Sequence, residues 1–261
     1  MSSVLNTFLV VIGAYVYVSL ARQISARPLQ VGAPALKLFG FAEAIVAALV
    51  ICWFLFILML SSGSQNDEIR NRDLAATAIF SIGFLLLLVA FLRLRGFDVG
   101  VLAGFSKIGF GRVIATGTLL LLAAYPLIVL ADALTQRFLG SGSSKQEIVE
   151  LFNGSQTMGQ RVGIIVLAVA VAPIAEEFIF RFFLYGVLKR YGGRVLGLLL
   201  SSLLFAAVHR HIPSFGPLFV LGGCFTIAYE WSGSILVTMT MHALFNSLSL
   251  AALAFPQTLP Q

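Results

Sequence analysis

Long apolar runs separated by short polar segments make up most of this 261-residue chain. A helix needs about 20 apolar residues to cross a bilayer, whereas a strand of a membrane barrel alternates apolar and polar side chains over about ten positions. The runs do not alternate, so the pattern predicts an all-α, polytopic membrane protein of about eight transmembrane helices, several of them short or broken. The expected spans are Val4–Leu20, Leu38–Leu60, Leu74–Leu92, Val113–Ala131, Val162–Ala172, Ile174–Leu188, Val195–His209, Pro217–Tyr229 and Ser234–Phe255.

Turn-forming and polar residues mark the breaks between these runs. Pro173 is expected to separate two short helices, and the sequences YGGRV (191–195) and HIPSFGP (211–217) are typical of turns. The longest polar segment, 140–156, predicts a loop with a short amphipathic helix at Gln146–Phe152.

Composition agrees with a membrane location. Hydrophobic residues make up 59% of the chain and charged residues 11%, whereas soluble domains carry about 25% charge. The basic residues form no stripe, so a nucleic-acid partner is not expected. Because no Lys or Arg precedes the first apolar run, we interpret that run as a membrane span rather than a signal peptide. The compact chain is expected in a bacterial cytoplasmic membrane, in contact with lipid.

The net charge of +6 also predicts an orientation. Basic residues are concentrated after the first and third apolar runs and after the paired glutamates at 176–177. Loops rich in Lys and Arg stay in the cytoplasm, so the N-terminus is expected outside. The residues that lead to this orientation are Arg22, Arg27, Lys37, Arg93, Arg95, Lys107, Arg112, Lys189, Arg190 and Arg194.

Several ionisable or amide side chains fall inside the apolar runs. A charged group at the centre of a bilayer costs on the order of 3 kcal/mol, so such residues are functional candidates. Glu43, near the start of its run, also fits a place at the membrane interface. The candidates are Glu43, Glu176, Glu177, Arg181, His209, His242 and Asn246.

The two adjacent glutamates are expected to differ. Glu177 and Arg181 lie four residues apart, so they can form an ion pair on one helix face, which is a structural role. Glu176 projects about 100° away and has no basic residue on its own turn. It therefore needs a partner from another helix, and it is the candidate general base.

Two histidines and an asparagine complete the candidate site. His209 ends one apolar run, and His242 and Asn246 lie four residues apart, so they project from one face of a later helix. His and Asn can both donate hydrogen bonds, and two aligned donors can form an oxyanion hole. A glutamate helped by one histidine could then activate water for attack on a peptide carbonyl, inside a central polar cavity.

These residues resemble the motifs of the CPBP family of CAAX proteases and bacteriocin-processing enzymes, also called Abi proteins. EEFIFR (176–181) fits EExxxR, FAAVH (205–209) fits FxxxH, and HALFN (242–246) fits HxxxN. The resemblance covers roughly 162–255. On this basis we divide one membrane domain into N-terminal transmembrane helices with a polar loop, a catalytic core and a tail, at 1–160 (loop 132–160), 161–255 and 256–261.

The resemblance implies a glutamate-dependent intramembrane endopeptidase that needs no cofactor and acts on a membrane-associated peptide or protein. It implies that Glu176 and His209 activate water and that His242 and Asn246 stabilise the oxyanion. Glu177, Arg181 and Phe205 would support them. Phe182 follows the arginine where many relatives have glycine, and Thr226 and Ile227 precede YE where a second glycine is frequent, which could alter the substrate groove.

Three alternatives stay open at this point. A CPBP-fold scaffold or bacteriocin-immunity protein would keep the fold without the chemistry. Glu and two His could supply three zinc ligands, although HExxH is absent. A transporter could also carry buried ionisable residues, although the sequence has no matched pair of broken helices.

Overall fold

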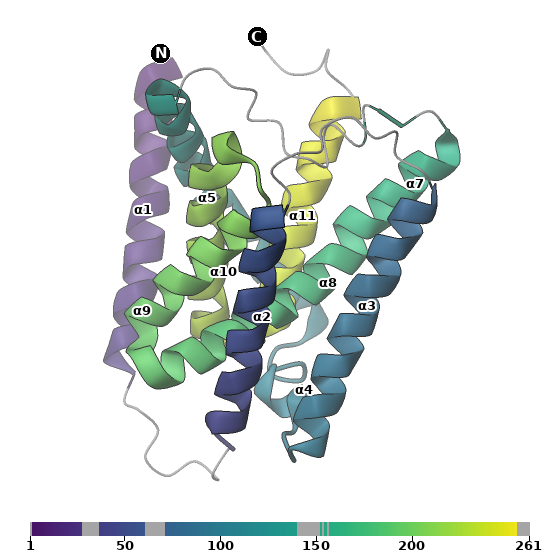
Figure 1. The fold of residues 1–261 in the computed structure, drawn as a ribbon. Helices are drawn as coiled ribbons and strands as arrows, with labels where there is room; N and C mark the ends of the chain where they lie inside the picture. The colour runs from purple at the N-terminus through teal and green to yellow at the C-terminus, as the bar shows by residue number, and fades with distance from the viewer. Residues whose placement is uncertain are drawn as a thin grey trace.

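Within residues 2–27, 37–60, 71–139, 152, 154–155 and 157–254, which the computed structural model describes, the chain forms helices and no strands. The described helices pack into one bundle (Figure 1), and seven helices among the described residues are long and apolar enough to cross a membrane. The prediction of an all-α membrane protein is confirmed. The elements are α1 (Ser2–Ala26), α2 (Phe41–Leu60), α3 (Asn71–Leu94), α4 (Val99–Leu102), α5 (Phe110–Leu139), α7 (Met158–Val166), η1 (Leu167–Val171), α8 (Ala172–Glu177), η2 (Phe178–Leu184), α9 (Tyr185–Val208), α10 (Ile212–Ser232) and α11 (Ile235–Ala254).

The helix that carries the paired glutamates passes through Pro173 without a break, so the expected separation at that residue is wrong. A proline has no N–H and its ring clashes with the carbonyl four residues earlier. The preceding segment η1 is a π-helix, in which the N–H of Ala172 bonds to the carbonyl of Leu167, five residues back. This wider turn accommodates the proline, and a second π-helical segment, η2, follows the glutamates.

The break lies at Gly193 instead, inside the predicted turn YGGRV. Its backbone has φ 81° and ψ 173°, a region that in practice only glycine occupies. The apolar segment Met158–Val208 is therefore two arms, one oblique arm from α7 into α9 and a second arm after Gly193 (Figure 1). Counting the arms separately gives the expected number of about eight crossings.

Other boundaries also differ from those expected. The start of the polar loop 132–160 is helical, because α5 continues to Leu139. Most of HIPSFGP is helical as well, because α10 begins at Ile212 and contains Pro217. The expected helix at Gln146–Phe152 falls outside the described residues except for its last position, and the tail 256–261 lies outside them too.

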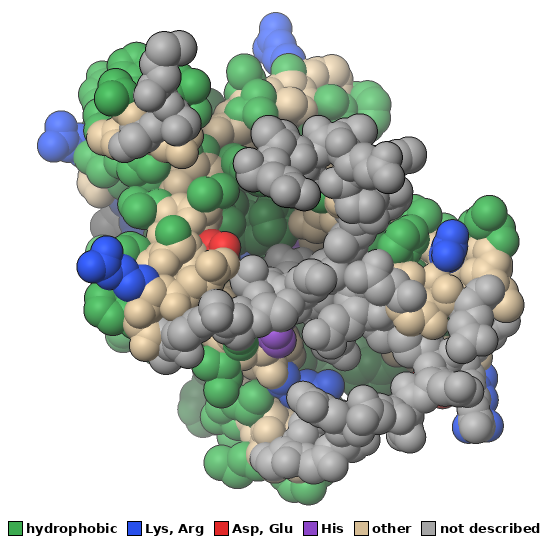
Figure 2. All heavy atoms as spheres, turned by 90° about the horizontal axis from the view of Figure 1, so that it is seen from above, with side chains coloured by type: hydrophobic (Ala, Val, Ile, Leu, Met, Phe, Trp, Pro, Cys, Tyr) green, Lys and Arg blue, Asp and Glu red, His purple; other side chains and the backbone are tan. Residues whose placement is uncertain are grey.

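The centre of the bundle is α10, which packs against α5 and α9. Half of its spanning window is buried (50%), compared with 6% of that of α3 on the periphery. Large apolar side chains such as Phe41, Phe80 and Phe110 are exposed on the outside. Seen from the end of the bundle that holds the N-terminus, hydrophobic side chains also cover much of the described surface (Figure 2). This distribution suits a bundle surrounded by lipid.

Glu43 has a structural environment. Its side chain is almost fully buried, accepts a hydrogen bond of 2.6 Å from the backbone N–H of Gly40, and pairs with Arg95 at 2.9 Å. The carboxylate therefore caps the start of α2 and ties it to the end of α3.

Candidate active site

The three sequence motifs meet inside the bundle, on α8, η2, α9 and α11. Phe205 of α9 lies between the two histidines of the motifs. Its ring centroid is 4.9 Å from that of His209 and 5.8 Å from that of His242, in edge-to-face arrangements. Segments more than 60 residues apart, such as those that carry Glu177 and His242, thus contribute to one cluster.

Glu177 and Arg181 form the expected ion pair, and both side chains are fully buried. The Nη1 atom of Arg181 lies 3.1 Å from Oε1 of Glu177, although the guanidinium makes no hydrogen bond of good geometry within the described part of the chain. Its Cζ atom instead lies over the ring of Phe205, 4.0 Å from the centroid, and 5.0 Å from the centroid of Phe225. Aromatic faces attract a cation in this geometry, so the charge is held by the carboxylate and the rings together.

His242 is a second partner of Glu177, which the sequence did not predict. The Nδ1 atom of His242 lies 2.9 Å from Oε1 of Glu177, and the imidazole is nearly fully buried. A carboxylate oxygen accepts, so Nδ1–H donates to it. This hydrogen bond fixes the plane of the ring and turns Nε2 away from Glu177.

Glu176 faces a different histidine. Its Oε2 atom lies 3.9 Å from Nε2 of His209, and the two side chains are 28% and 29% exposed. Within the described residues this buried oxygen has no hydrogen-bond partner. The Nδ1 atom of His209 is 2.7 Å from the carbonyl of Phe205, which can only accept, so Nδ1 carries the proton. In the neutral ring Nε2 is then a second free acceptor that faces Glu176.

Asn246 contacts the backbone of the glutamate helix. Its side-chain NH₂ donates to the carbonyl of Ala168 at 2.8 Å. Inside η1 this carbonyl lacks a helical partner, because the N–H of Ala172 bonds to Leu167 and Pro173, the next residue, has no N–H. The amide of Asn246 therefore satisfies an acceptor that the proline leaves open, and its second N–H is not used by this bond.

The structure thus brings Glu176, Glu177, Arg181, Phe205, His209 and His242 into one cluster, whereas the contact of Asn246 is with the backbone of η1. Glu176 with His209 and Glu177 with His242 form two neighbouring carboxylate–imidazole pairs. The sequence did not predict the pairing of Glu177 with His242, because Arg181 on the same helix already provided Glu177 with an ion-pair partner.

A zinc-binding cluster is not present among the described residues. No group of three or more His, Cys, Asp or Glu side chains is arranged there so that it could hold a metal ion. Each histidine of the site is instead hydrogen-bonded through Nδ1 to protein, to a carbonyl in one case and to a carboxylate in the other.

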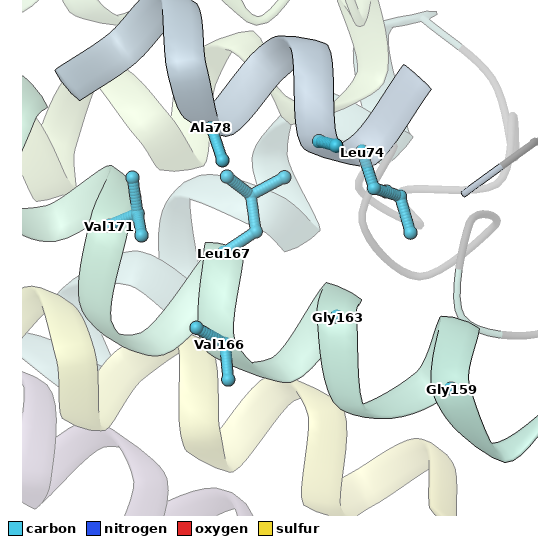
Figure 3. A pocket seen from close by; sticks show the side chains of 8 residues that line it. Leu74, Ala78, Gly159, Gly163, Val166, Leu167 and Val171 are labelled. Carbon is cyan, nitrogen blue, oxygen red and sulfur yellow. The ribbon is translucent and has the colours of Figure 1, made fainter. Parts of the chain in front are cut away.

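An apolar hollow of about 330 Å³ lies beside the segment that leads to the glutamates. Leu74 and Ala78 of α3 form one wall, and Leu167 and Val171 of η1 form the other, with Gly159 and Gly163 along α7 (Figure 3). The two glycines carry no side chain into this space. The hollow is apolar and lies on the side of the oblique arm that faces α3.

The fold and site together define a polytopic helical membrane protein with paired carboxylates and imidazoles inside its bundle. Residues 159–248 match the family model described as type II CAAX prenyl endopeptidase Rce1-like. Over 82 residues the chain is 30% identical to the membrane-embedded CAAX protease MroQ of Staphylococcus aureus (strain USA300). The aligned segment covers 29% of this chain and 33% of that protein. No solved structure matches the chain.

The match to the family model falls on the part of the chain that carries the three motifs. This part of the chain is similar to CAAX proteases, the proteins whose motifs it resembles. The similarity spans about a third of the length of the curated relative.

Proposed function

We propose that this protein is an intramembrane endopeptidase of glutamic type, in the bacterial cytoplasmic membrane, which hydrolyses a peptide bond of a membrane-associated protein or peptide. The observation that carries the proposal is the arrangement of Glu176 and His209. Two acceptor atoms, 3.9 Å apart, face each other between helices, and the side chains that carry them are partly accessible. One water molecule can donate a hydrogen bond to each of them.

A water held through both hydrogens presents its lone pairs to an incoming carbonyl carbon. Glu176 accepts a proton as the water oxygen bonds to that carbon, with His209 orienting the water as the second acceptor. The proton then passes to the amide nitrogen as the C–N bond breaks. The products are a carboxylic acid and an amine, and Glu176 returns to its starting form.

The developing oxyanion needs donors on the opposite side of the carbonyl. The second N–H of Asn246 and Nε2 of His242 are the groups that the sequence assigns to this task. His242 can donate there when both ring nitrogens carry protons, because Nδ1–H is committed to Glu177. Glu177, Arg181 and Phe205 hold this ring and the glutamate helix in place.

The test compares the wild type with Glu176→Gln and with Asp73→Asn, a matched loss of a carboxylate at an exposed position of α3. Each is expressed in the cell of origin after deletion of the gene, and new protein termini are quantified by mass spectrometry. We expect Glu176→Gln to reduce processing of specific precursors by at least about 100-fold, while Asp73→Asn does not.

The alternative of a catalytically silent scaffold makes the opposite prediction. A scaffold would restore the phenotype of the deletion strain equally well with Glu176→Gln, and no precursor would accumulate. Activity of the purified protein that survives 1,10-phenanthroline would count against zinc-dependent hydrolysis.

A further inference from the structure

A second hollow, about 280 Å³ in volume, lies between α5, α10 and α11. Its lining is mixed in character. Tyr125 and Phe245 provide aromatic surface, and Asp132, Ser214 and Ser249 provide polar groups. This mixture distinguishes it from the apolar hollow beside η1 and suits a ligand that has both an apolar stem and a polar end.

The carboxylate of Asp132 is only half satisfied. Its Oδ2 atom accepts a hydrogen bond of 2.8 Å from Gln136, one turn further along α5. Its Oδ1 atom is buried and has no hydrogen-bond partner, and within the described residues no Lys or Arg forms an ion pair with Asp132. A carboxylate in a spanning helix without a counter-charge is costly, so a cationic ligand would be stabilised here.

One wall of this hollow belongs to α11, the helix that carries the proposed catalytic residues His242 and Asn246. Ser249 lies seven residues after His242, on nearly the same face of α11, and three residues after Asn246. At 1.5 Å per residue, these separations are about 10 Å and about 4.5 Å along the helix axis. Ser214 belongs to the first turn of α10, which follows the short segment after His209, and its hydroxyl lies 2.8 Å from Nδ1 of His211.

We propose that this hollow binds a Lys or Arg side chain of the peptide substrate, with Asp132 as its counter-charge. The apolar stem of that side chain would lie against Tyr125 and Phe245, and its cationic end would reach the carboxylate. An extended peptide advances about 3.3 Å per residue, so the basic residue stands within about three positions of the cleaved bond. This proposal rests on the proposed function, because it describes which substrate residue binds next to the proposed active site.

The test uses purified wild type, Asp132→Asn and Asp132→Lys in lipid nanodiscs, with Asp73→Asn as the control. Each is incubated with a peptide mixture produced from a bacterial proteome by cleavage after glutamate, which leaves Lys and Arg inside the peptides. Mass spectrometry of the new termini gives the residue preference at each position. We expect the wild type and the control to favour Lys or Arg at one fixed position by at least about tenfold. Asp132→Asn should lose this preference, and Asp132→Lys should favour Asp or Glu there. A wild type without a basic preference, or an Asp132→Asn variant that keeps it, would overturn the proposal.

A binding measurement separates this proposal from the proposed chemistry. Fluorescent decapeptides that differ only by Lys, Leu or Glu at one position, scanned along the peptide, are titrated into Glu176→Gln and into Glu176→Gln/Asp132→Asn. Tighter binding of a Lys peptide that depends on Asp132 supports the basic subsite, whether or not the wild type cleaves any peptide. A wild type that cleaves nothing would instead contradict the proposed proteolysis. Equal binding of the three peptides at every position overturns the subsite. A hollow that is occupied by a lipid amine instead of a substrate side chain would give this result.

Discussion

At the scale of single residues, the two adjacent glutamates have opposite surroundings. Glu177 is enclosed completely and shares its charge with Arg181 and His242. Glu176 stays partly accessible and keeps one oxygen free of any hydrogen bond within the described residues. The difference follows from their directions, because consecutive residues of a helix project about 100° apart.

Removing Arg181 should destabilise the fold strongly. Arg181→Met leaves the carboxylate of Glu177 buried without its cation, and breaking a buried pair in this way costs about 3–5 kcal/mol. The double variant Arg181→Met/Glu177→Gln should recover part of that loss, because an amide carries no charge and can still hydrogen-bond to His242. Thermal unfolding in detergent micelles measures the effect, with Arg190→Met as the exposed control. A double variant no more stable than Arg181→Met would contradict this account.

At the scale of the elements, the glutamate helix and α11 are joined by a side chain that replaces a missing backbone donor. Pro173 leaves the carbonyl of Ala168 open, and Asn246 donates to it across the helix interface. The bond sets where α11, with His242, stands relative to Glu176 and Glu177. Asn246 is therefore a positioning residue as well as a candidate oxyanion donor.

A double-mutant cycle can separate these two roles of Asn246. In the wild-type background, Asn246→Ala leaves a buried carbonyl unpaired, which should cost about 1–3 kcal/mol. In the background of Pro173→Ala, the restored N–H can bond to Ala168, so the same substitution should cost clearly less. Thermal unfolding reports the stability, and peptide cleavage by the same samples reports the activity. If Asn246 also binds the oxyanion, activity stays low in the double variant although stability returns. An equal loss of stability in both backgrounds would contradict the positioning role.

The elements also show what the sequence can and cannot predict. Apolar runs identified the membrane helices because length and composition decide whether a segment crosses a bilayer. The break at Pro173 was predicted wrongly because a π-helical turn, which leaves no sequence pattern, relieves the clash. Asp132 was assigned to a loop because its charge ended the apolar run, although the backbone of α5 continues to Leu139.

Of the candidate site, the parts predicted from sequence were those set by helical spacing. The Glu177–Arg181 pair follows from a separation of four residues. The contact of Glu177 with His242 spans 65 positions of the chain and depends on how α8 and α11 pack, which spacing cannot give. The same holds for the bond from Asn246 to a backbone carbonyl. Every residue has such a carbonyl, so the sequence does not mark the one that lacks a helical partner.

At the scale of the whole molecule, basic groups from distant helices converge on one end of the bundle. Arg194 donates to the carbonyl of Ile24 at 3.0 Å, and Arg27 donates to the carbonyl of Glu230 at 3.3 Å. The carboxylate of Glu230 also pairs with Lys189 at 2.6 Å. This end therefore carries a dense positive cluster, as expected of the cytoplasmic side.

Site-directed labelling should reveal this orientation. In a background of Cys52→Ala and Cys224→Ala, single cysteines replace Phe138 at the end of α5 or Tyr191 beside Gly193, both exposed positions. A maleimide that cannot cross membranes should label position 138 in intact cells and position 191 only after lysis, because the basic end is predicted to face the cytoplasm. Labelling of position 191 in intact cells, or of both positions equally, would contradict the predicted orientation.

The enclosure of Glu177 has a practical consequence for anyone who maps this protein by mutagenesis. If Glu176 acts as proposed, a survey scored by activity alone would rank both glutamates as indispensable, Glu176 for the reaction and Glu177 for the fold. Thermal stability separates the two residues. A Glu176 variant should be inactive but as heat-stable as the wild type, whereas a Glu177 variant should be both inactive and less heat-stable.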